Sequence, residues 1–181
     1  SKSATCVVRR DVFKQVGGFD PSYYILGEET ELSWRCWLQG YQSWYFPSAK
    51  SWHAFGTLLK PPADFYTLER IHRYGCRNYL SMLFTNLGLA RLLCILPVHL
   101  SAWLAATGGF LGSGQWKRAV CIMRGLSDFF LSLPVLWRKR VRVQSGRKVS
   151  DRALFKYIYH RAALSYYFGR FRRYLMQGLH G

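Results

Sequence analysis

The sequence predicts an α/β segment over residues 1–63, followed by a mainly helical tail that runs to residue 181. Three observations support this fold class. Short apolar stretches and one helical pattern alternate in the first segment. Residues 92–114 contain no Asp, Glu, Lys or Arg, and the last part of the chain is rich in basic and aromatic side chains. Half of the residues are hydrophobic, so a folded chain is expected.

The first predicted elements are a strand and a short helix. Residues 4–8 are apolar and end before two arginines, which is typical of a buried strand. A short helix is predicted over residues 12–16, with Asp11 as its N-terminal cap. Two glycines, Gly17 and Gly18, then end this helix, because glycine readily adopts the left-handed conformation found there.

A longer helix and two extended pieces follow. Residues 28–39 begin with acidic side chains, which favour a helix N-terminus, and Gly40 marks the helix end. Residues 41–46 are rich in β-prone aromatic side chains and predict a strand. Residues 49–52 predict a second short extended piece that leads to His53.

The rest of the chain divides into three parts. Residues 64–91 predict a connecting helix, residues 92–137 apolar and amphipathic membrane-associated helices, and residues 138–181 a basic, aromatic tail. A charge-free run of this length is a candidate membrane segment. Pro97 and the Gly108-Gly109 pair favour a bent interfacial or re-entrant pair over one straight span. The alternative is a buried core helix, with the basic residues on a solvated face.

The charge balance predicts an anionic partner. The 26 Lys and Arg residues outnumber nine Asp and Glu, which gives a net charge of +17. Nucleic acid, an anionic membrane face or a phosphorylated substrate would each satisfy this charge. We predict no nucleic-acid partner, because no nucleic-acid-binding motif occurs and the charge-free run would have no role. The five cysteines show no metal-binding spacing and predict free thiols in a reducing compartment.

The acidic side chains are concentrated at one place. Glu28, Glu29 and Glu31 supply three of the nine carboxylates within four residues. They are either solvated acids that complement a helix dipole, or a site that needs a general base. The apolar residues 23–26 before them and Trp34 after them favour a partly buried site.

His53 is the second candidate. It ends an extended piece and is followed by a loop that contains Gly56 and two prolines. An imidazole in such a position can bind a metal ion. The alternative is a partly buried histidine that only forms hydrogen bonds.

The order of several motifs resembles one enzyme family. The motifs are Val16-Gly17-Gly18-Phe19-Asp20, Gly27-Glu28-Glu29-Thr30-Glu31-Leu32-Ser33-Trp34-Arg35, Gly40-Tyr41, Pro47 and His53. Together they resemble the C-terminal half of the catalytic domain of inverting family 2 glycosyltransferases, which have the GT-A fold. The rhamnosyltransferase-like branch is the most similar. Arg77-Asn78, Asn86-Leu87 and residues 147–152 also resemble the tail of that branch.

The resemblance implies roles for individual residues. Glu29 would be the general base that deprotonates the acceptor hydroxyl, with Glu28 as the alternative. The family usually has Asp at the positions of Glu29 and Glu31. Residues Glu31, Trp34 and Arg35 would contact substrate. His53 would help to hold Mg²⁺ or Mn²⁺, which would be completed by residues outside this chain.

The resemblance also implies a setting for the reaction. The donor would be a nucleotide-diphosphate sugar and the transferred group hexosyl or rhamnosyl. The acceptor would be polyprenyl-linked or a saccharide, in surface polysaccharide synthesis at the cytoplasmic face of the bacterial inner membrane. The sequence has no Asp-x-Asp motif, so the donor-binding half is expected to be missing and this chain alone inactive. The alternative function is a non-catalytic, basic membrane-binding module.

Overall fold

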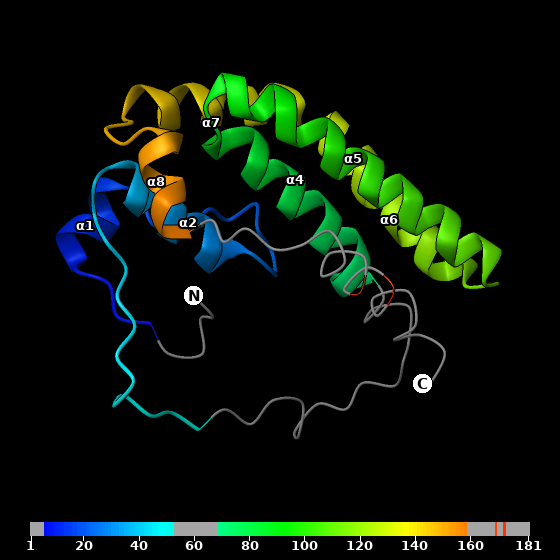
Figure 1. The fold of residues 1–181 in the computed structure, drawn as a ribbon, viewed down its shortest axis with the longest axis horizontal. Helices are drawn as coiled ribbons and strands as arrows, with labels where there is room; N and C mark the ends of the chain where they lie inside the picture. Colours follow the sequence, from blue (N-terminus) through cyan, green and yellow to red (C-terminus); the bar gives the residue numbers. More distant parts are fainter. Residues whose placement is uncertain (1–5, 53–68, 159–168, 170–171, 173–181) are drawn as a thin grey trace.

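The computed structural model describes residues 6–52 and 69–158, together with residues 169 and 172. Its helices are α1 Arg10–Gln15, α2 Glu28–Leu38, the π-helical turn η1 Glu69–Tyr74, α4 Gly75–Asn86, α5 Leu89–Gly112, α6 Trp116–Leu131, α7 Leu133–Ser145 and α8 Asp151–Ile158. In Figure 1, α4, α5 and α6 lie side by side as a bundle. Helices α1, α2 and α8 lie together at one end of this bundle. The molecule therefore has two packed regions.

The predicted α/β fold is wrong for the part of the chain that the structure describes, which is mainly helical and contains no strand. Residues 6–8 and 41–46 are irregular where strands were predicted, and so are residues 49–52. An extended segment becomes a strand only when its backbone pairs with a neighbour. No segment among the described residues pairs with these pieces, so their β-prone side chains alone do not make a sheet.

The helix predictions agree better with the structure. Helix α2 covers almost all of the predicted range, and Gly40 follows it with a left-handed φ of 90°. Gly17 and Gly18 also have positive φ values after α1. Asp11 does not cap α1; it lies in the first turn and pairs with Arg9, which is the N-cap residue.

The apolar run forms one helix and not a bent pair. Helix α5 continues through Pro97, and its two adjacent glycines keep helical backbone angles. The bend lies further along, where α6 and α7 meet at 62°. Pro134 occupies the first turn of α7, where its missing N–H costs no hydrogen bond, so it begins a helix instead of ending one.

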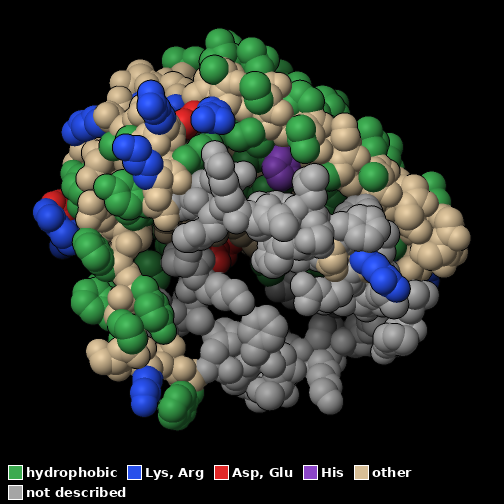
Figure 2. Space-filling model, in the orientation of Figure 1, with side chains coloured by type: hydrophobic (Ala, Val, Ile, Leu, Met, Phe, Trp, Pro, Cys, Tyr) green, Lys and Arg blue, Asp and Glu red, His purple; other side chains and the backbone are tan. Residues whose placement is uncertain are grey.

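Helix α5 is long and apolar enough to cross a membrane, and α6 and α7 pass the same test together. Only 11% of the most apolar part of α5 is buried, whereas a core helix would be mostly buried. Figure 2 shows hydrophobic side chains along the upper edge of the molecule, over α5. An exposed apolar helix of this kind favours an apolar environment outside the protein.

Two cores hold the regions together. The larger core joins α4, α5, α6 and α7 and contains Cys76, Leu80, Ala106, Phe110, Ala119, Ile122, Leu126, Phe129 and Leu136. The smaller core joins α1 to α2 and contains Val12, Val16, Leu32 and Cys36. Trp34 of α2 packs on a third cluster at Leu83, Leu87 and Leu92, which links the two regions. All five cysteines are free, as predicted.

Candidate functional site

The start of α2 is fixed by a side chain from α4. Leu26 and Gly27 both have left-handed backbone angles, with φ of 69° and 92°. Such an angle is uncommon for leucine and needs support from its surroundings. Asn78 supplies that support, because its amide donates hydrogen bonds to the carbonyls of Ile25 at 2.7 Å and Leu26 at 2.9 Å. Arg77 donates another to Ser22 at 3.0 Å.

Glu28 and Glu29 open the helix as two half-buried acids. One oxygen of each, Oε2, is shielded from solvent and accepts no hydrogen bond from any residue that the structure describes. A shielded, unpaired carboxylate oxygen is costly, although the helix N-terminus offsets part of this cost. Each carboxylate therefore has one oxygen whose capacity to accept a hydrogen bond is unused among the described residues.

Glu31 has a different environment from the two acids before it. Arg35 Nε donates to Glu31 Oε1 at 2.7 Å, and Arg35 Nη2 donates to Oε2 at 2.6 Å. The two side chains are only 4% and 11% exposed, so this bidentate pair is buried. Arg35 also donates to the carbonyls of Val16 and Gly18 and thereby ties the glycine turn to α2. Both residues position the backbone, and their predicted contact with substrate stays a prediction.

The structure describes Trp34 but not His53, the two remaining residues of the predicted site. Trp34 is half-buried, and its indole Nε1 is shielded without an acceptor among the described residues. Its packing between α2 and the α4–α5 region gives it a structural role, and its predicted substrate contact stays a prediction. His53 lies outside the described residues, so the metal site predicted there stays a prediction.

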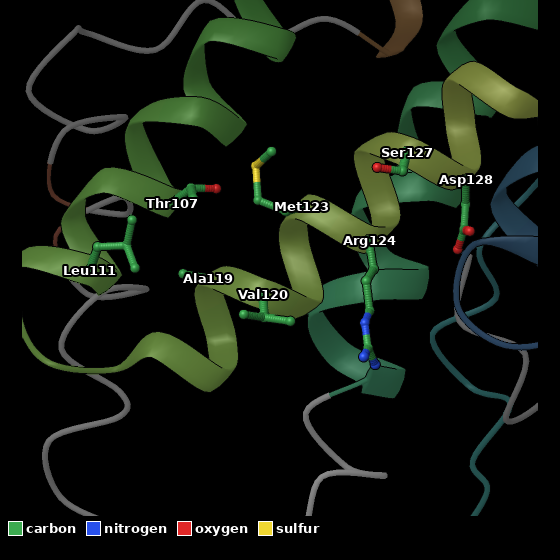
Figure 3. A pocket seen from close by; sticks show the side chains of 8 residues that line it. All are labelled: Thr107, Leu111, Ala119, Val120, Met123, Arg124, Ser127 and Asp128. Atoms are coloured by element: carbon green, nitrogen blue, oxygen red, sulfur yellow. The ribbon is translucent and has the colours of Figure 1, made fainter.

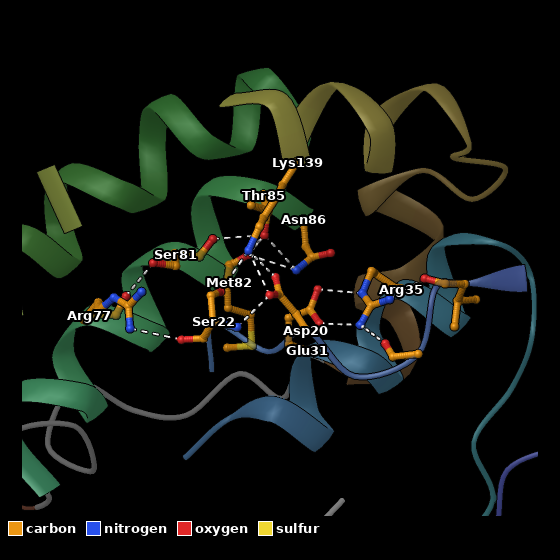
Figure 4. Close-up of polar contacts among 12 residues, drawn as sticks. Asp20, Ser22, Glu31, Arg35, Arg77, Ser81, Met82, Thr85, Asn86 and Lys139 are labelled. Carbon is orange, nitrogen blue, oxygen red and sulfur yellow. Dashed lines mark hydrogen bonds and ion pairs between the residues drawn. The ribbon is translucent and has the colours of Figure 1, made fainter. Parts of the chain in front are cut away.

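A lysine far along the chain completes the polar network around α2. Lys139 of α7 donates to Asp20 at 2.8 Å and 2.6 Å, and to the hydroxyl of Ser22 at 2.8 Å. Figure 4 shows Lys139 reaching down to Asp20 beside Thr85 of α4. Burial alone would raise the pKa of Asp20, but hydrogen bonds from Lys139 and Ser22 lower it below its usual value. Asp20 is therefore held as an ion.

A cavity of about 330 Å³ lies beside this network, between the α1–α2 region and α7. Its lining includes both ion pairs, with Asp20, Glu31, Arg35 and Lys139 among the polar groups. Sequence reasoning missed Lys139, because it occurs among the basic residues of the predicted tail, where nothing distinguishes it from its neighbours. Asp20 was visible as the last residue of the Gly-Gly-Phe-Asp motif, but no pattern paired it with a lysine 119 residues away.

Comparison with known proteins assigns the chain to a class of enzymes. Residues 3–146 match the model of glycosyl transferase family group 2, which covers most of the chain. The chain therefore belongs to this family, and the match supports a transferase that acts on sugars. No curated protein sequence and no solved structure matches it.

Proposed function

We propose that this chain takes part in transferring a sugar, with inversion, from a nucleotide-diphosphate donor to a polyprenyl-linked or saccharide acceptor in surface polysaccharide synthesis. Family membership supports sugar transfer. The observation that carries the finer proposal is the pair of shielded Oε2 atoms on Glu28 and Glu29, neither of which accepts a hydrogen bond within the described part of the chain. A general base needs such an unoccupied acceptor.

The proposed reaction has a simple balance. The acceptor hydroxyl oxygen forms a bond to the anomeric carbon of the donor sugar as the bond from that carbon to the diphosphate breaks. The diphosphate leaves with the bonding electron pair, and the hydroxyl proton moves to a carboxylate oxygen of the enzyme. Glu29 takes this proton in our proposal, and Glu28 is the alternative base.

The loop before α2 makes this role physically reasonable. Asn78 binds two successive carbonyls there, so the first turn of α2 is held against α4. The buried Glu31–Arg35 pair holds the same helix from the other side, through the carbonyls of Val16 and Gly18. Fixing the base in this way matters, because displacing a catalytic group by about 1 Å can lower the reaction rate by on the order of 100-fold.

A divalent metal is not part of the proposed steps. No three His, Cys, Asp or Glu side chains come together as a metal site in residues 6–52 and 69–158. A divalent ion is often held by one or two carboxylates together with substrate phosphates, so the Mg²⁺ or Mn²⁺ site stays a prediction, and we derive no step through a metal ion. The predicted ligand His53 lies outside the described residues.

We place the reaction at the cytoplasmic face of the bacterial inner membrane. The exposed apolar surface of α5 and the net charge of +17 support contact with an anionic membrane surface. A non-catalytic, basic membrane-binding module would have these same two features. The two functions differ in whether Glu28 and Glu29 are needed for sugar transfer, and the following experiment distinguishes them.

The experiment compares three carboxyl-to-amide variants in the full protein: Glu29→Gln, Glu28→Gln and, as the control, Asp11→Asn. Asp11 is an exposed acid on α1. We expect Glu29→Gln to lower sugar transfer by roughly 100-fold to 10,000-fold, the usual contribution of a general base, while donor affinity is retained. The control should transfer sugar at the rate of the unmodified protein.

Three other outcomes are informative. A large loss for Glu28→Gln and none for Glu29→Gln would move the base to Glu28. Unchanged transfer in both variants would overturn the proposed mechanism. Absence of transfer from every sugar nucleotide tried, with membrane binding intact, would favour the non-catalytic module.

A further inference from the structure

Two hollows in the described structure are large enough for a small molecule. One is a groove of about 420 Å³ between α5 and α6, shown in Figure 3. Both charged residues of its lining already interact with other groups, since Asp128 pairs with Arg73 at 2.7 Å and Arg124 has an interaction of its own. The other is the cavity of about 330 Å³ between α2 and α7, which we call the α2–α7 cavity. Its lining retains an unpaired charge.

Four segments of the chain form the α2–α7 cavity. It is lined by the end of α1 with the loop that follows, by α2, by one residue of α4, and by α7. Lys139, Arg142 and Val143 share a face of α7, because they are three and four residues apart. Arg35 and Gln39 share a face at the C-terminal end of α2 in the same way. The cavity therefore forms only when α7 packs against the α1–α2 region.

The two acids of the lining are already satisfied. Both carboxylate oxygens of Asp20 accept hydrogen bonds from Lys139, and the backbone N–H of Ser22 donates another at 2.9 Å. Both carboxylate oxygens of Glu31 accept hydrogen bonds from Arg35. A cationic ligand would have to break one of these ion pairs, so the cavity disfavours cations.

The remaining charge of the lining is positive. Three basic and two acidic side chains line the cavity, and two of the basic ones belong to the ion pairs. The third, Arg142, is exposed, and its guanidinium group forms no ion pair or hydrogen bond with any residue that the structure describes. A guanidinium group is well suited to bind a carboxylate or a phosphate. Arg142 therefore favours an anionic ligand.

Gln39 adds a second unused donor at the same end of the cavity. Tyr41 donates to Gln15 Oε1 at 2.7 Å, and Gln15 Nε2 donates to Gln39 Oε1 at 3.0 Å. This order leaves Gln39 Nε2 as a donor without an acceptor in the described part of the chain. A Cβ atom on Gly146 would lie 3.1 Å from this Nε2 and 3.7 Å from the carbonyl oxygen of Arg142. The two donors are therefore near each other.

An apolar wall completes the cavity. Phe19 lines it and is 47% exposed, while an edge-on contact with Phe13 at 5.6 Å holds its ring in place. Pro21 extends this apolar wall. A sugar ring presents apolar C–H groups as well as hydroxyl groups, so it can use an apolar wall and a few polar groups at once.

We propose that the α2–α7 cavity binds one sugar unit that carries a carboxylate or phosphate group. The anionic group lies at Arg142 and Gln39, and the sugar ring lies against Phe19. Family membership makes a sugar the ligand class to expect. The volume is near the lower end of the usual range for ligand sites, about 300–1,000 Å³, so it suits one sugar unit better than a whole nucleotide-linked donor. Assigning this sugar to the acceptor rests on the proposed function, whereas the binding itself does not.

The test measures the affinity of the full protein for glucuronate, glucose 6-phosphate and neutral glucose by titration in saturation-transfer NMR. We expect both acidic sugars to bind and glucose to bind at least about tenfold more weakly. A hydrogen bond to a charged group typically contributes 1.4 kcal/mol or more, which corresponds to this factor. None of these measurements needs a donor or turnover.

Three variants locate the site. Arg142→Gln should weaken binding of the acidic sugars by about tenfold and leave glucose unchanged. Arg152→Gln removes the same charge from an exposed position on α8 and should change each affinity less than twofold. Phe19→Ala should weaken all three sugars, because it removes the wall that they share. Circular dichroism would check that each variant is folded.

Several results would overturn the proposal. Equal losses for Arg142→Gln and Arg152→Gln would reduce the preference to an effect of net charge. Inorganic phosphate or acetate that binds as tightly as the acidic sugars would identify a free anion as the ligand. Tighter, Arg142-dependent binding of a nucleoside diphosphate would make the cavity a donor site. Absence of binding for all three sugars would remove the site and leave the Glu28 and Glu29 experiment untouched, just as failure of that experiment would leave sugar binding untouched.

Discussion

Beside α1 and α2, the ion pairs Glu31–Arg35 and Asp20–Lys139 are largely shielded from solvent, whereas along α5 and α6 apolar side chains are left exposed. The first region holds its backbone with Arg35, Asn78 and Lys139, each of which bonds to groups far away in the sequence. The second region relies on apolar packing around Phe110 and Ile122, and its outer surface lacks any cover within the described structure.

The difference indicates that the two regions have different roles: one fixes the positions of side chains, and the other offers an apolar surface for contact. Hydrogen bonds from charged groups are strong and directional, so they can hold a segment of the chain in one geometry. Apolar surface has no such directionality, and it suits contact with a fluid lipid phase. The two regions should therefore respond differently to mutation, and stability measurements can test this.

The largest effect is expected for Arg35→Met. This change leaves the carboxylate of Glu31 buried without its partner and releases the carbonyls of Val16 and Gly18. Breaking a buried ion pair on one side costs about 3–5 kcal/mol, which thermal or denaturant unfolding would detect. The double variant Glu31→Gln with Arg35→Met should recover part of this loss. A loss below about 1 kcal/mol would show that the pair is effectively solvated.

A smaller effect is expected for Gly125→Ala in the helical bundle. A Cβ atom at residue 125 would lie 2.5 Å from the Arg73 carbonyl oxygen and 3.1 Å from the Cys76 Cβ. Because the first of these is a backbone atom, α6 must move away from η1, and overpacking of this kind costs about 1–3 kcal/mol.

Gly108→Ala on α5 is the matched control for this close contact. No atom beyond its chain neighbours and its own helix backbone lies within 4 Å of its Cβ position, and alanine favours helix over glycine by up to about 1 kcal/mol. The control should therefore be neutral or more stable in the same unfolding experiment. Equal destabilisation by both changes would contradict the close packing of α6 on η1.

Local patterns predicted much of the helical structure. Acids at the start and a glycine at the end identified α2 to within a residue or two, because capping preferences act locally. The apolar run identified the core of α5 for the same reason. The strand predictions were wrong, because a strand needs a neighbouring extended segment to pair with. The β-prone residues 41–46 have no such neighbour among the described residues.

The site was only partly visible in the sequence. The acidic cluster and the Gly-Gly-Phe-Asp motif are contiguous, so they could be found by reading the chain. The spacing of Glu31 and Arg35 is local as well, since residues four apart face each other on a helix, but the bonds from Arg35 to the glycine turn depend on the fold. Lys139 and the α5–α6 groove depend on how α7 and α6 pack, which no local pattern specifies.

The last prediction concerns the buried ring of His72 and tests whether water reaches the core of the bundle. Its ring is buried and packs edge-on against Phe110 of α5 at 5.5 Å. Burial lowers the pKa of His72 to about 4, and the positive charge of Arg118 acts in the same direction. An unfolded histidine has a pKa of about 6.5, so between these values the unfolded state binds more protons.

The free energy of unfolding should therefore be highest above about pH 6.5 and fall as the pH is lowered toward about 4, by roughly 3 kcal/mol at most. Denaturant unfolding at a series of pH values would measure this decrease. His72→Gln should remove the histidine's share of the decrease, because glutamine does not titrate. If the variant keeps the same pH dependence, the ring is hydrated in the folded state and water reaches the core of the bundle.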